Sequence, residues 1–250
     1  MGHNSRKKMK AVILAAGISS RLYPLTRTTP KCLLAIGGKA LIGHQIESLT
    51  RCGVKNIAVV VGFRQKKVIN YLLKNYPDLN FSFIFNPLFA SSNTIYSLWL
   101  TRGFFTGNDF LFFNGDVLCS FAVVKKLAAY SGSVLAVKKG PADLEAVRVA
   151  GKRFISDIGK DIPMRESVGE FIGVAKFSPD FTPIFIKHLS QRVKINKQEY
   201  FESALWQAIR KDDVRLLLLD IKSEPAIEID FDKDLSAAKL LYKANKISWA

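Results

Sequence analysis

Short runs of β-branched and aromatic residues alternate with segments of helical spacing along most of the chain, and this alternation constrains the fold more than any other feature. The first run, residues 10–15, leads into small residues at 16–20, which is typical of a buried strand that enters a loop. Apolar residues then recur at helical spacing over 41–52, and a second β-branched run follows over 56–62. The sequence therefore opens with a strand–helix–strand unit.

The same alternation continues almost to the end of the chain. We expect helices near 65–74, 94–102, 121–130, 179–189, 200–211 and 235–243, strands near 81–85, 110–113, 133–137, 171–177 and 216–219, and shorter pieces near 147–149 and 154–158. This order predicts an α/β fold with a mostly parallel central sheet, helices on both faces and a smaller substrate-side insertion.

The chain shows no internal repeat and no linker-like tract, so we expect residues 9–250 to form a single domain. Residues 1–8 are expected to be a disordered leader or an expression remnant, because Met9 is also a plausible first residue. The three cysteines lie far apart without metal-ligand spacing, which favours free thiols in a reducing compartment. With no apolar run of about 18 residues and no signal peptide, the sequence predicts a cytoplasmic protein.

The chain of 250 residues carries 37 Lys and Arg against 21 Asp and Glu, a net charge of +16 that attracts anions. Nucleotides, nucleic acids and acidic lipids are all compatible with this charge. The basic residues are scattered, however, without a long basic block or an RNA-binding signature, so we do not expect a nucleic acid partner.

Residues 14–22, Leu-Ala-Ala-Gly-Ile-Ser-Ser-Arg-Leu, place small side chains directly after the first predicted strand. Backbone N–H groups of such a loop can hold a phosphate chain, and Arg21 would add a fixed cation. Taken alone, this stretch is equally compatible with an ordinary strand-to-loop turn. Pro30-Lys31 follows about ten residues later, and its ammonium could offset charge on an attacked phosphorus.

Carboxylates follow two further predicted strands. Asn114-Gly115-Asp116 ends an apolar run, and Asp116 could ligate magnesium beside nucleotide phosphates. In Glu228-Ile229-Asp230, strand alternation puts Glu228 and Asp230 on one face. The sequence thus predicts that Asp116 and Asp230 share a metal, although a Gly-turn aspartate also occurs simply as a turn former.

Several ordered motifs together make the chain resemble the sugar-phosphate nucleotidyltransferases, and within them the bacterial phosphocholine cytidylyltransferase-like proteins. The resemblance runs from Met9 to about Leu241. Its markers are LAAGISSRLYPLT, PKCLL, NPLFASSNTIYSLW, FFNGDV, IGKD, GEFIGVAKFS, YFESAL and EIDFDKDLSAA. It implies a Rossmann-like nucleotidyltransferase fold, an NTP donor with a lean to CTP, Mg²⁺ and a small phosphorylated acceptor.

The resemblance also implies roles for individual residues. The catalytic residues would be Lys31, Arg21 and Asp116, and the metal ligands Asp116 and Asp230. The nucleotide would be bound by Leu14, Ala15, Ala16, Gly17, Ser19, Arg21, Lys31, Asn93, Ser97 and Gly115, and the acceptor by Lys160, Glu170 and Tyr200. One departure concerns Ser19, which stands where many relatives have a second glycine.

The expected reaction is nucleotidyl transfer to phosphocholine or a related phosphoamine or phosphonate, with release of pyrophosphate. It needs no protein nucleophile, so the lack of a Ser/His/Asp or Cys/His pattern does not count against it. Two alternatives stay open: a sugar-1-phosphate nucleotidyltransferase that uses UTP, dTTP or GTP, and a non-catalytic nucleotide- or nucleic-acid-binding protein on the same fold. The sequence does not disclose the acceptor or the oligomeric state.

Overall fold

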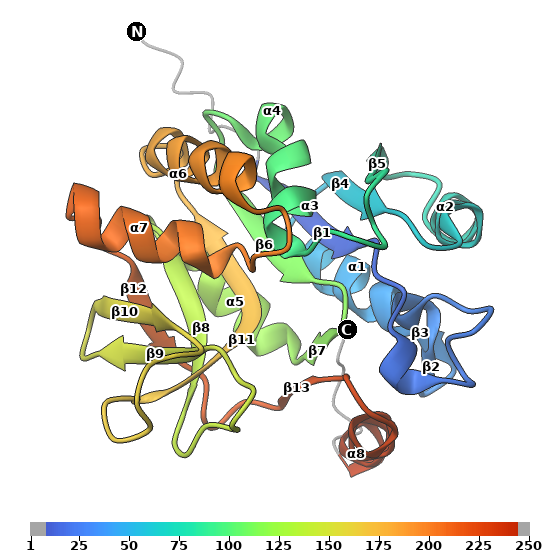
Figure 1. Ribbon diagram of the computed structural model, residues 1–250. Helices are drawn as coiled ribbons and strands as arrows, with labels where there is room; N and C mark the ends of the chain where they lie inside the picture. Colours follow the sequence, from blue (N-terminus) through green and yellow to red (C-terminus); the bar gives the residue numbers. More distant parts are fainter. Residues whose placement is uncertain (1–8, 245–250) are drawn as a thin grey trace, which may run out of the picture.

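The computed structural model describes residues 9–244, and a nine-stranded sheet runs through it (Figure 1). Four strands pair in parallel in the order β6-β1-β4-β5: β1 (Lys10–Ala15), β4 (Asn56–Val61), β5 (Asn80–Phe85) and β6 (Phe110–Asn114). The apolar runs of β1, β4 and β6 are buried, as parallel strands covered on both faces require, whereas the edge strand β5 is only partly buried. The carboxyl ends of β1 and β6 therefore lie side by side.

The sheet continues beyond β6 through a long antiparallel strand, β11 (Gly169–Phe177). Both β8 (Val134–Lys139) and β9 (Arg148–Gly151) pair antiparallel with β11, and β10 (Ile155–Gly159) pairs with β9. A further strand, β12 (Leu217–Asp220), runs parallel to β8. The expected α/β fold is confirmed. The direction of β11 was not predictable, because buried strands of either direction carry continuous apolar residues.

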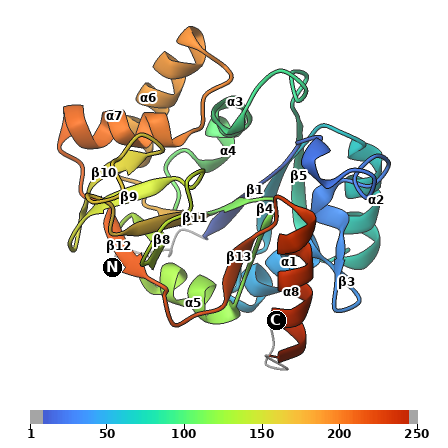
Figure 2. The ribbon, with the colours of Figure 1, turned by 60° about the horizontal axis from the view of Figure 1, so that its bottom comes forward.

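Helices cover both faces of the sheet (Figures 1 and 2). One face carries α1 (Leu41–Arg51), α2 (Gln65–Asn75) and α5 (Phe121–Ala129), and the other carries α3 (Thr94–Leu100), α4 (Arg102–Phe105), α6 (Thr182–Ile195) and α7 (Glu202–Asp212). The side chains of β1 divide between the two cores: Val12 and Leu14 pack with α3 and α6, whereas Ala11 and Ile13 pack with α1. Because successive side chains of a strand point to opposite faces of the sheet, β1 contacts the helices on both faces.

The remaining elements complete the fold. They are η1 (Ser20–Leu22), η2 (Lys31–Leu33), β2 (Ala35–Ile36), β3 (Lys39–Ala40), β7 (Val117–Cys119), β13 (Ala226–Glu228) and α8 (Asp232–Ala244). Antiparallel pairing of β13 with β7 brings residues 226–228 beside the turn after β6. The N–H of Ile229 donates to the carbonyl of Asp116 at 3.0 Å, which fixes residues 228–230 against this turn.

Two expected helices differ from the observed ones. The helix expected over 94–102 is split at Thr101 into α3 and α4, where the Thr101 hydroxyl donates to the carbonyl of Leu98. The helix expected over 179–189 begins at Thr182, after a turn closed on the carbonyl of Ser178, and extends to Ile195. The leader expected over 1–8 lies outside the described residues. Among the described residues, no helix combines the length and apolar character needed to cross a membrane.

Candidate active site

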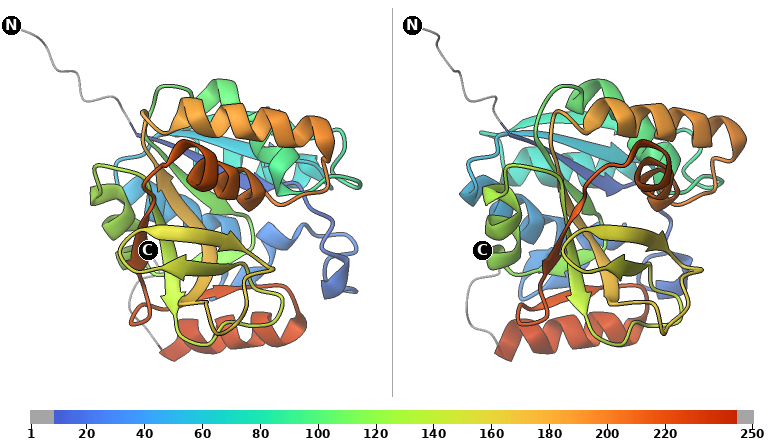
Figure 3. Two further views of the ribbon diagram at one scale, coloured as in Figure 1. Left: turned by 60° about the vertical axis from the view of Figure 1, so that its left-hand side comes forward. Right: turned by 90° about the vertical axis from the view of Figure 1, so that its left-hand side faces the viewer.

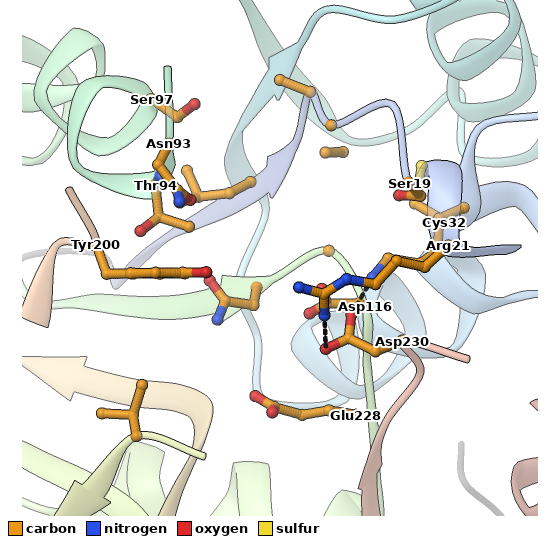
Figure 4. A pocket seen from close by; sticks show the side chains of 18 of the residues that line it. Ser19, Arg21, Cys32, Asn93, Thr94, Ser97, Asp116, Tyr200, Glu228 and Asp230 are labelled. Atoms are coloured by element: carbon orange, nitrogen blue, oxygen red, sulfur yellow. Dashed lines mark hydrogen bonds and ion pairs between the residues drawn. The ribbon is translucent and has the colours of Figure 1, made fainter. Parts of the chain in front are cut away.

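A polar cavity of about 360 Å³ lies at the carboxyl ends of β1 and β6 (Figure 4). Leu14 and Asn114 are opposite each other in the parallel register, and the N–H of Gly115 donates to the carbonyl of Leu14 at 2.9 Å. A Cβ atom on Gly115 would lie 2.3 Å from that carbonyl oxygen, so only glycine fits here. This close approach places Asp116 beside the loop that follows β1.

The loop after β1 lines one side of the cavity with Ala16, Gly17 and Ser19. Ser19 has a left-handed backbone with φ of 56°, and its carbonyl accepts hydrogen bonds from Leu22 N–H and from the Thr26 hydroxyl at 2.7 Å. Glycine adopts this conformation without strain, whereas serine does so at a cost. Ser19 thus adopts the left-handed turn that glycine would form at this position without strain.

Lys31 links the two predicted metal ligands. Its ammonium donates to Asp116 Oδ2 at 2.8 Å and to Asp230 Oδ1 at 2.9 Å, and only 13% of its side chain is exposed. Burial alone would lower the pKa of Lys31, but the carboxylates of Asp116 and Asp230 raise it above its usual value. Lys31 is therefore a fixed positive charge inside the cavity.

Burial tends to raise the pKa of Asp230, but the ammonium of Lys31 and the guanidinium of Arg21 bring it below its usual value. Arg21 Nη1 lies 3.8 Å from Asp230 Oδ2 (Figure 4). The same nitrogen lies 3.5 Å from Glu145 Oε2. Half of the Arg21 side chain is exposed, and its guanidinium also lies over the ring of Phe231. Arg21 is thus placed at the mouth of the cavity.

The two aspartates fit a magnesium ion. Asp116 Oδ1 is buried and has no hydrogen-bond partner among the described residues, while Asp116 Oδ2 and Asp230 Oδ1 contact the Lys31 ammonium and Asp230 Oδ2 faces Arg21. Mg²⁺ is commonly held by one or two carboxylates together with substrate phosphates, so a pair of aspartates suffices. Within residues 9–244, no group of three or more His, Cys, Asp and Glu side chains is arranged to hold a metal ion.

The buried Glu202 and the half-buried Glu228 also face the cavity, and Glu202 was not predicted from the sequence. Ile229 is fully buried on the opposite side, which confirms that Glu228 and Asp230 share a face. Burial, with Asp116 and Asp230 nearby, raises the pKa of Glu228 well above its usual value. Burial raises the pKa of Glu202 to about 7, and its Oε2 has no hydrogen-bond partner among the described residues.

The opposite wall holds the residues expected to meet the base or the acceptor. Asn93 Oδ1 accepts from the N–H of Thr94 at 2.8 Å and so caps α3, while Ser97 Oγ accepts from the amide of Asn86 at 3.0 Å. Asn86 is a further polar wall residue that the sequence did not single out.

The Lys160 ammonium lies 4.5 Å from the centre of the Tyr200 ring. The predicted site residues that line the cavity are Leu14, Ala15, Ala16, Gly17, Ser19, Arg21, Lys31, Asn93, Ser97, Gly115, Asp116, Lys160, Tyr200 and Asp230. Glu170 is not among the lining residues, and its carboxylate accepts a long hydrogen bond of 3.4 Å from the N–H of Asp143.

The cysteines are free thiols. Cys32 lines the cavity, but burial raises its pKa to about 12, and burial does the same for Cys119. Neither thiol is ionised near neutral pH, so neither is an activated nucleophile. His44 and His188 lie in α1 and α6 away from this cavity.

Known proteins are similar to this chain in sequence and in fold. The family model described as "Nucleotidyl transferase" matches residues 10–141. A choline-phosphate cytidylyltransferase of Streptococcus pneumoniae is 42% identical over 94 residues, which cover 38% of this chain and 39% of that enzyme. The match therefore spans less than two thirds of that relative.

A CTP:phosphoglutamine cytidylyltransferase of Campylobacter jejuni is 30% identical over 191 residues, 69% of this chain and 74% of that enzyme. The solved inositol-1-phosphate CTP transferase of T. maritima superposes with a TM-score of 0.79 at 22% identity, over 96% of this chain and 98% of that one, and so shares the fold. The family model matches more than half of the chain, and the match to the second relative covers more than two thirds of that enzyme, so the chain belongs to the nucleotidyl transferase family.

Proposed function

We propose that the protein transfers a nucleotidyl group, with a preference for cytidylyl, from an NTP to a small phosphorylated metabolite and releases pyrophosphate. The observation that carries the proposal is the set of Lys31, Asp116 and Asp230, held within hydrogen-bond distance beside a glycine-containing loop at the end of β1. A cation and two carboxylates beside such a loop are what a triphosphate with its metal requires. We further propose that residues 9–250 act as one domain, because β1 belongs to both cores.

The reaction needs no covalent intermediate on the protein. A phosphate oxygen of the acceptor attacks the α-phosphorus of the NTP in line, a new P–O bond forms, and the bond to the bridging oxygen breaks. The electron pair of that bond leaves with pyrophosphate. Lys31 offsets negative charge at the α-phosphate, and Arg21, at the mouth of the cavity, braces the phosphate chain.

Asp116 and Asp230 would hold Mg²⁺, which supplies Lewis-acid stabilisation of the phosphate oxygens when it is bound. The backbone of residues 14–19 and Gly115 would position the nucleotide, with Asn93 and Ser97 on the base side. Lys160 and Tyr200 would meet the acceptor. Glu170 does not line the cavity, so we assign it no direct contact with the acceptor.

The preference for CTP and a phosphoamine is supported by the two cytidylyltransferase relatives. A screen of pyrophosphate release tests it, with CTP, UTP, dTTP, GTP and ATP each paired with phosphocholine, phosphoethanolamine, inositol 1-phosphate and glucose 1-phosphate. We expect release to be fastest with CTP. A clear preference for UTP, dTTP or GTP with glucose 1-phosphate would instead identify a sugar-1-phosphate nucleotidyltransferase.

A further inference from the structure

One edge of the central sheet ends in β5, which pairs with β4 on its inner side (Figure 1). The N–H groups of Asn80 and Asn86 donate at 2.9 Å to carbonyl groups at the two ends of β4. Backbone groups of successive strand residues point alternately to the two sides of a strand. The N–H and C=O groups of Phe81, Phe83 and Phe85 therefore point away from β4.

These outward backbone groups are unpaired. Among residues 9–244, the N–H and C=O groups of Phe81, Phe83 and Phe85 have no hydrogen-bond partner. An open edge can pair with another strand, and proteins usually prevent this with charged side chains, proline or a bulge. The register of β5 with β4 is unbroken, the strand has no charged residue, and Pro87 lies beyond its end. The edge of β5 thus lacks these protections.

The edge strand at the other end of the sheet, β10, is protected. The register of β10 with β9 shifts between Ile155 and Asp157, and α7 packs against β10 (Figure 3). Arg210 of α7 also donates to the carboxylate of Asp157. An irregular and charged edge resists the addition of a strand. The open edge is therefore a property of β5 and is not shared by β10.

The sequence around β5 carries no charge. Charged residues make up 23% of the chain, yet residues 79–101 contain none, and this is the longest uncharged stretch. Two copies that each carry a net charge of +16 repel each other over much of their surface. They can approach most closely where charge is absent, and β5 lies inside this stretch.

β5 is complementary to a second copy of itself. In an antiparallel pair with its two-fold axis at Phe83, Phe81 faces Phe85 of the second copy, and all the outward N–H and C=O groups are used. A shifted register would place Phe85 opposite Leu79, or Phe81 opposite Pro87. The N–H of Leu79 already donates to a turn carbonyl at 3.2 Å, and proline has no N–H. The register centred on Phe83 therefore satisfies the edge best.

The side chains of these residues also favour this pairing. Phe81, Phe83 and Phe85 lie on one face of the strand, because side chains alternate. The rings of Phe81 and Phe83 stack with their centres 5.5 Å apart, and Phe85 is 46% exposed. Aromatic residues that face each other across antiparallel strands stabilise the pair. Pairing would thus continue the row of rings into the second copy.

We propose that two copies of this protein associate through β5, antiparallel about a two-fold axis at Phe83, so that their two sheets join into one. Such a pair uses the open edge of both copies, and the dimer is therefore closed. The inference goes beyond the proposed function and does not depend on it, because no residue of β5 lines the candidate active site.

Sedimentation velocity over about a hundredfold range of protein concentration tests the inference, because the dimer population follows mass action. We expect a monomer–dimer equilibrium. As the dimer forms, amide hydrogen exchange measured by NMR should slow at Phe81, Phe83 and Phe85. The N–H groups of Ser82 and Ile84 point toward β4 and should exchange slowly at every concentration. A monomer throughout, growth beyond the dimer, or a dimer without this alternating protection would overturn the inference.

The Phe85→Lys substitution places a charge opposite Phe81 of the second copy. The Kd of the dimer should rise at least about tenfold, because two symmetric cross-strand pairs change. Ile195→Lys, at an exposed apolar residue of α6, adds the same charge elsewhere and should leave the Kd unchanged. Circular dichroism checks that both variants fold. An unchanged Kd in folded Phe85→Lys, or an equal rise in both variants, would overturn the inference, and the exchange pattern of the wild type decides alone if Phe85→Lys does not fold.

Discussion

At the residue scale, Lys31 occupies the space between the two carboxylates that would hold a metal. Its N···O distances of 2.8 and 2.9 Å leave no room for an ion that approaches oxygen to about 2.0–2.1 Å, as Mg²⁺ does. Lys31 and a metal shared by the same two oxygens therefore exclude each other. The ammonium stabilises the paired carboxylates, and metal binding would release it toward the phosphates.

A Lys31→Ala variant tests this role. We expect turnover to fall at least about a hundredfold, because a group that offsets transition-state charge commonly contributes that much. Binding of Mn²⁺, followed by electron paramagnetic resonance, should become tighter, because the competing ammonium is gone. Lys66→Ala, at an exposed lysine of α2, is the control and should change neither quantity. Weaker Mn²⁺ binding would contradict the competition between Lys31 and the metal. A change confined to the KM of the acceptor would show that Lys31 does not offset charge at the α-phosphate.

Glu202 makes stability depend on pH. Burial raises its pKa from the usual 4.5 to about 7, with Lys160 lowering it and Asp116 raising it. Because the folded pKa exceeds the unfolded one, the stabilisation is complete below about pH 4.5 and is lost as pH rises through 7. The difference corresponds to roughly 3 kcal/mol.

Urea unfolding at pH 5 and pH 8 measures this effect. The unfolding free energy of the wild type should fall between these pH values by up to roughly 3 kcal/mol more than that of Glu202→Gln, which cannot ionise. The same decrease in both proteins would mean that Glu202 is not the group responsible. Glu228 is present in both proteins, but the carboxylate of Glu202 is one of the causes that raise its pKa, so the comparison reports Glu202 together with its effect on Glu228.

At the element scale, the contact between the end of β1 and the turn after β6 determines the geometry of the candidate active site. Gly115→Ala would place a Cβ atom 2.3 Å from the carbonyl oxygen of Leu14, and backbone cannot yield there without shifting the strands. We expect a loss of at least about 2 kcal/mol in unfolding free energy and a large loss of activity.

Gly103→Ala is the matched control. Gly103 lies in α4, where an added Cβ atom would meet no other atom within 4 Å, and its φ is not in the left-handed region. Alanine there should stabilise the protein by about 0.5–1 kcal/mol through helix propensity. Thermal unfolding of both variants measures the contrast, and similar stabilities would refute the packing argument at Gly115.

Most elements could be predicted because each carries a local signal. The β-branched runs of β1 and β4 and the helical spacing of α1 are patterns within a few residues, and the glycine and carboxylates of the site follow them directly. A second cavity, of about 910 Å³ between β10 and α7, could not be predicted, because residues such as Arg210 and Asp157 meet only through the packing of α7 against β10. The only signal for Glu202 was its place in YFESAL, beside the predicted Tyr200.

At the scale of the whole molecule, the net charge of +16 is not concentrated in the first cavity. The charged residues that line this cavity are Arg21, Lys31, Lys160, Asp116, Glu145, Glu202, Glu228 and Asp230. The surplus of positive charge therefore lies on the rest of the chain, where it raises the local concentration of anionic substrates.

A filter-binding titration with duplex DNA checks whether this charge instead serves nucleic acid binding. We expect only the non-specific affinity of a basic protein, a Kd of about 10⁻⁴–10⁻⁶ M at physiological salt. Nanomolar, salt-dependent binding without pyrophosphate release from any NTP would favour a nucleic-acid-binding protein on this fold.

The most direct test of the central claim is pyrophosphate release by the purified protein with CTP and the acceptor panel, with and without Mg²⁺. The account predicts release that requires both Mg²⁺ and an acceptor, and that falls to a few per cent or less in folded Asp116→Ala and Asp230→Ala, by roughly the two decades typical of such electrostatic groups. Asp78→Ala, at an exposed aspartate before β5, should retain full release. Near-normal release by both folded site variants, or release without Mg²⁺, would contradict the account.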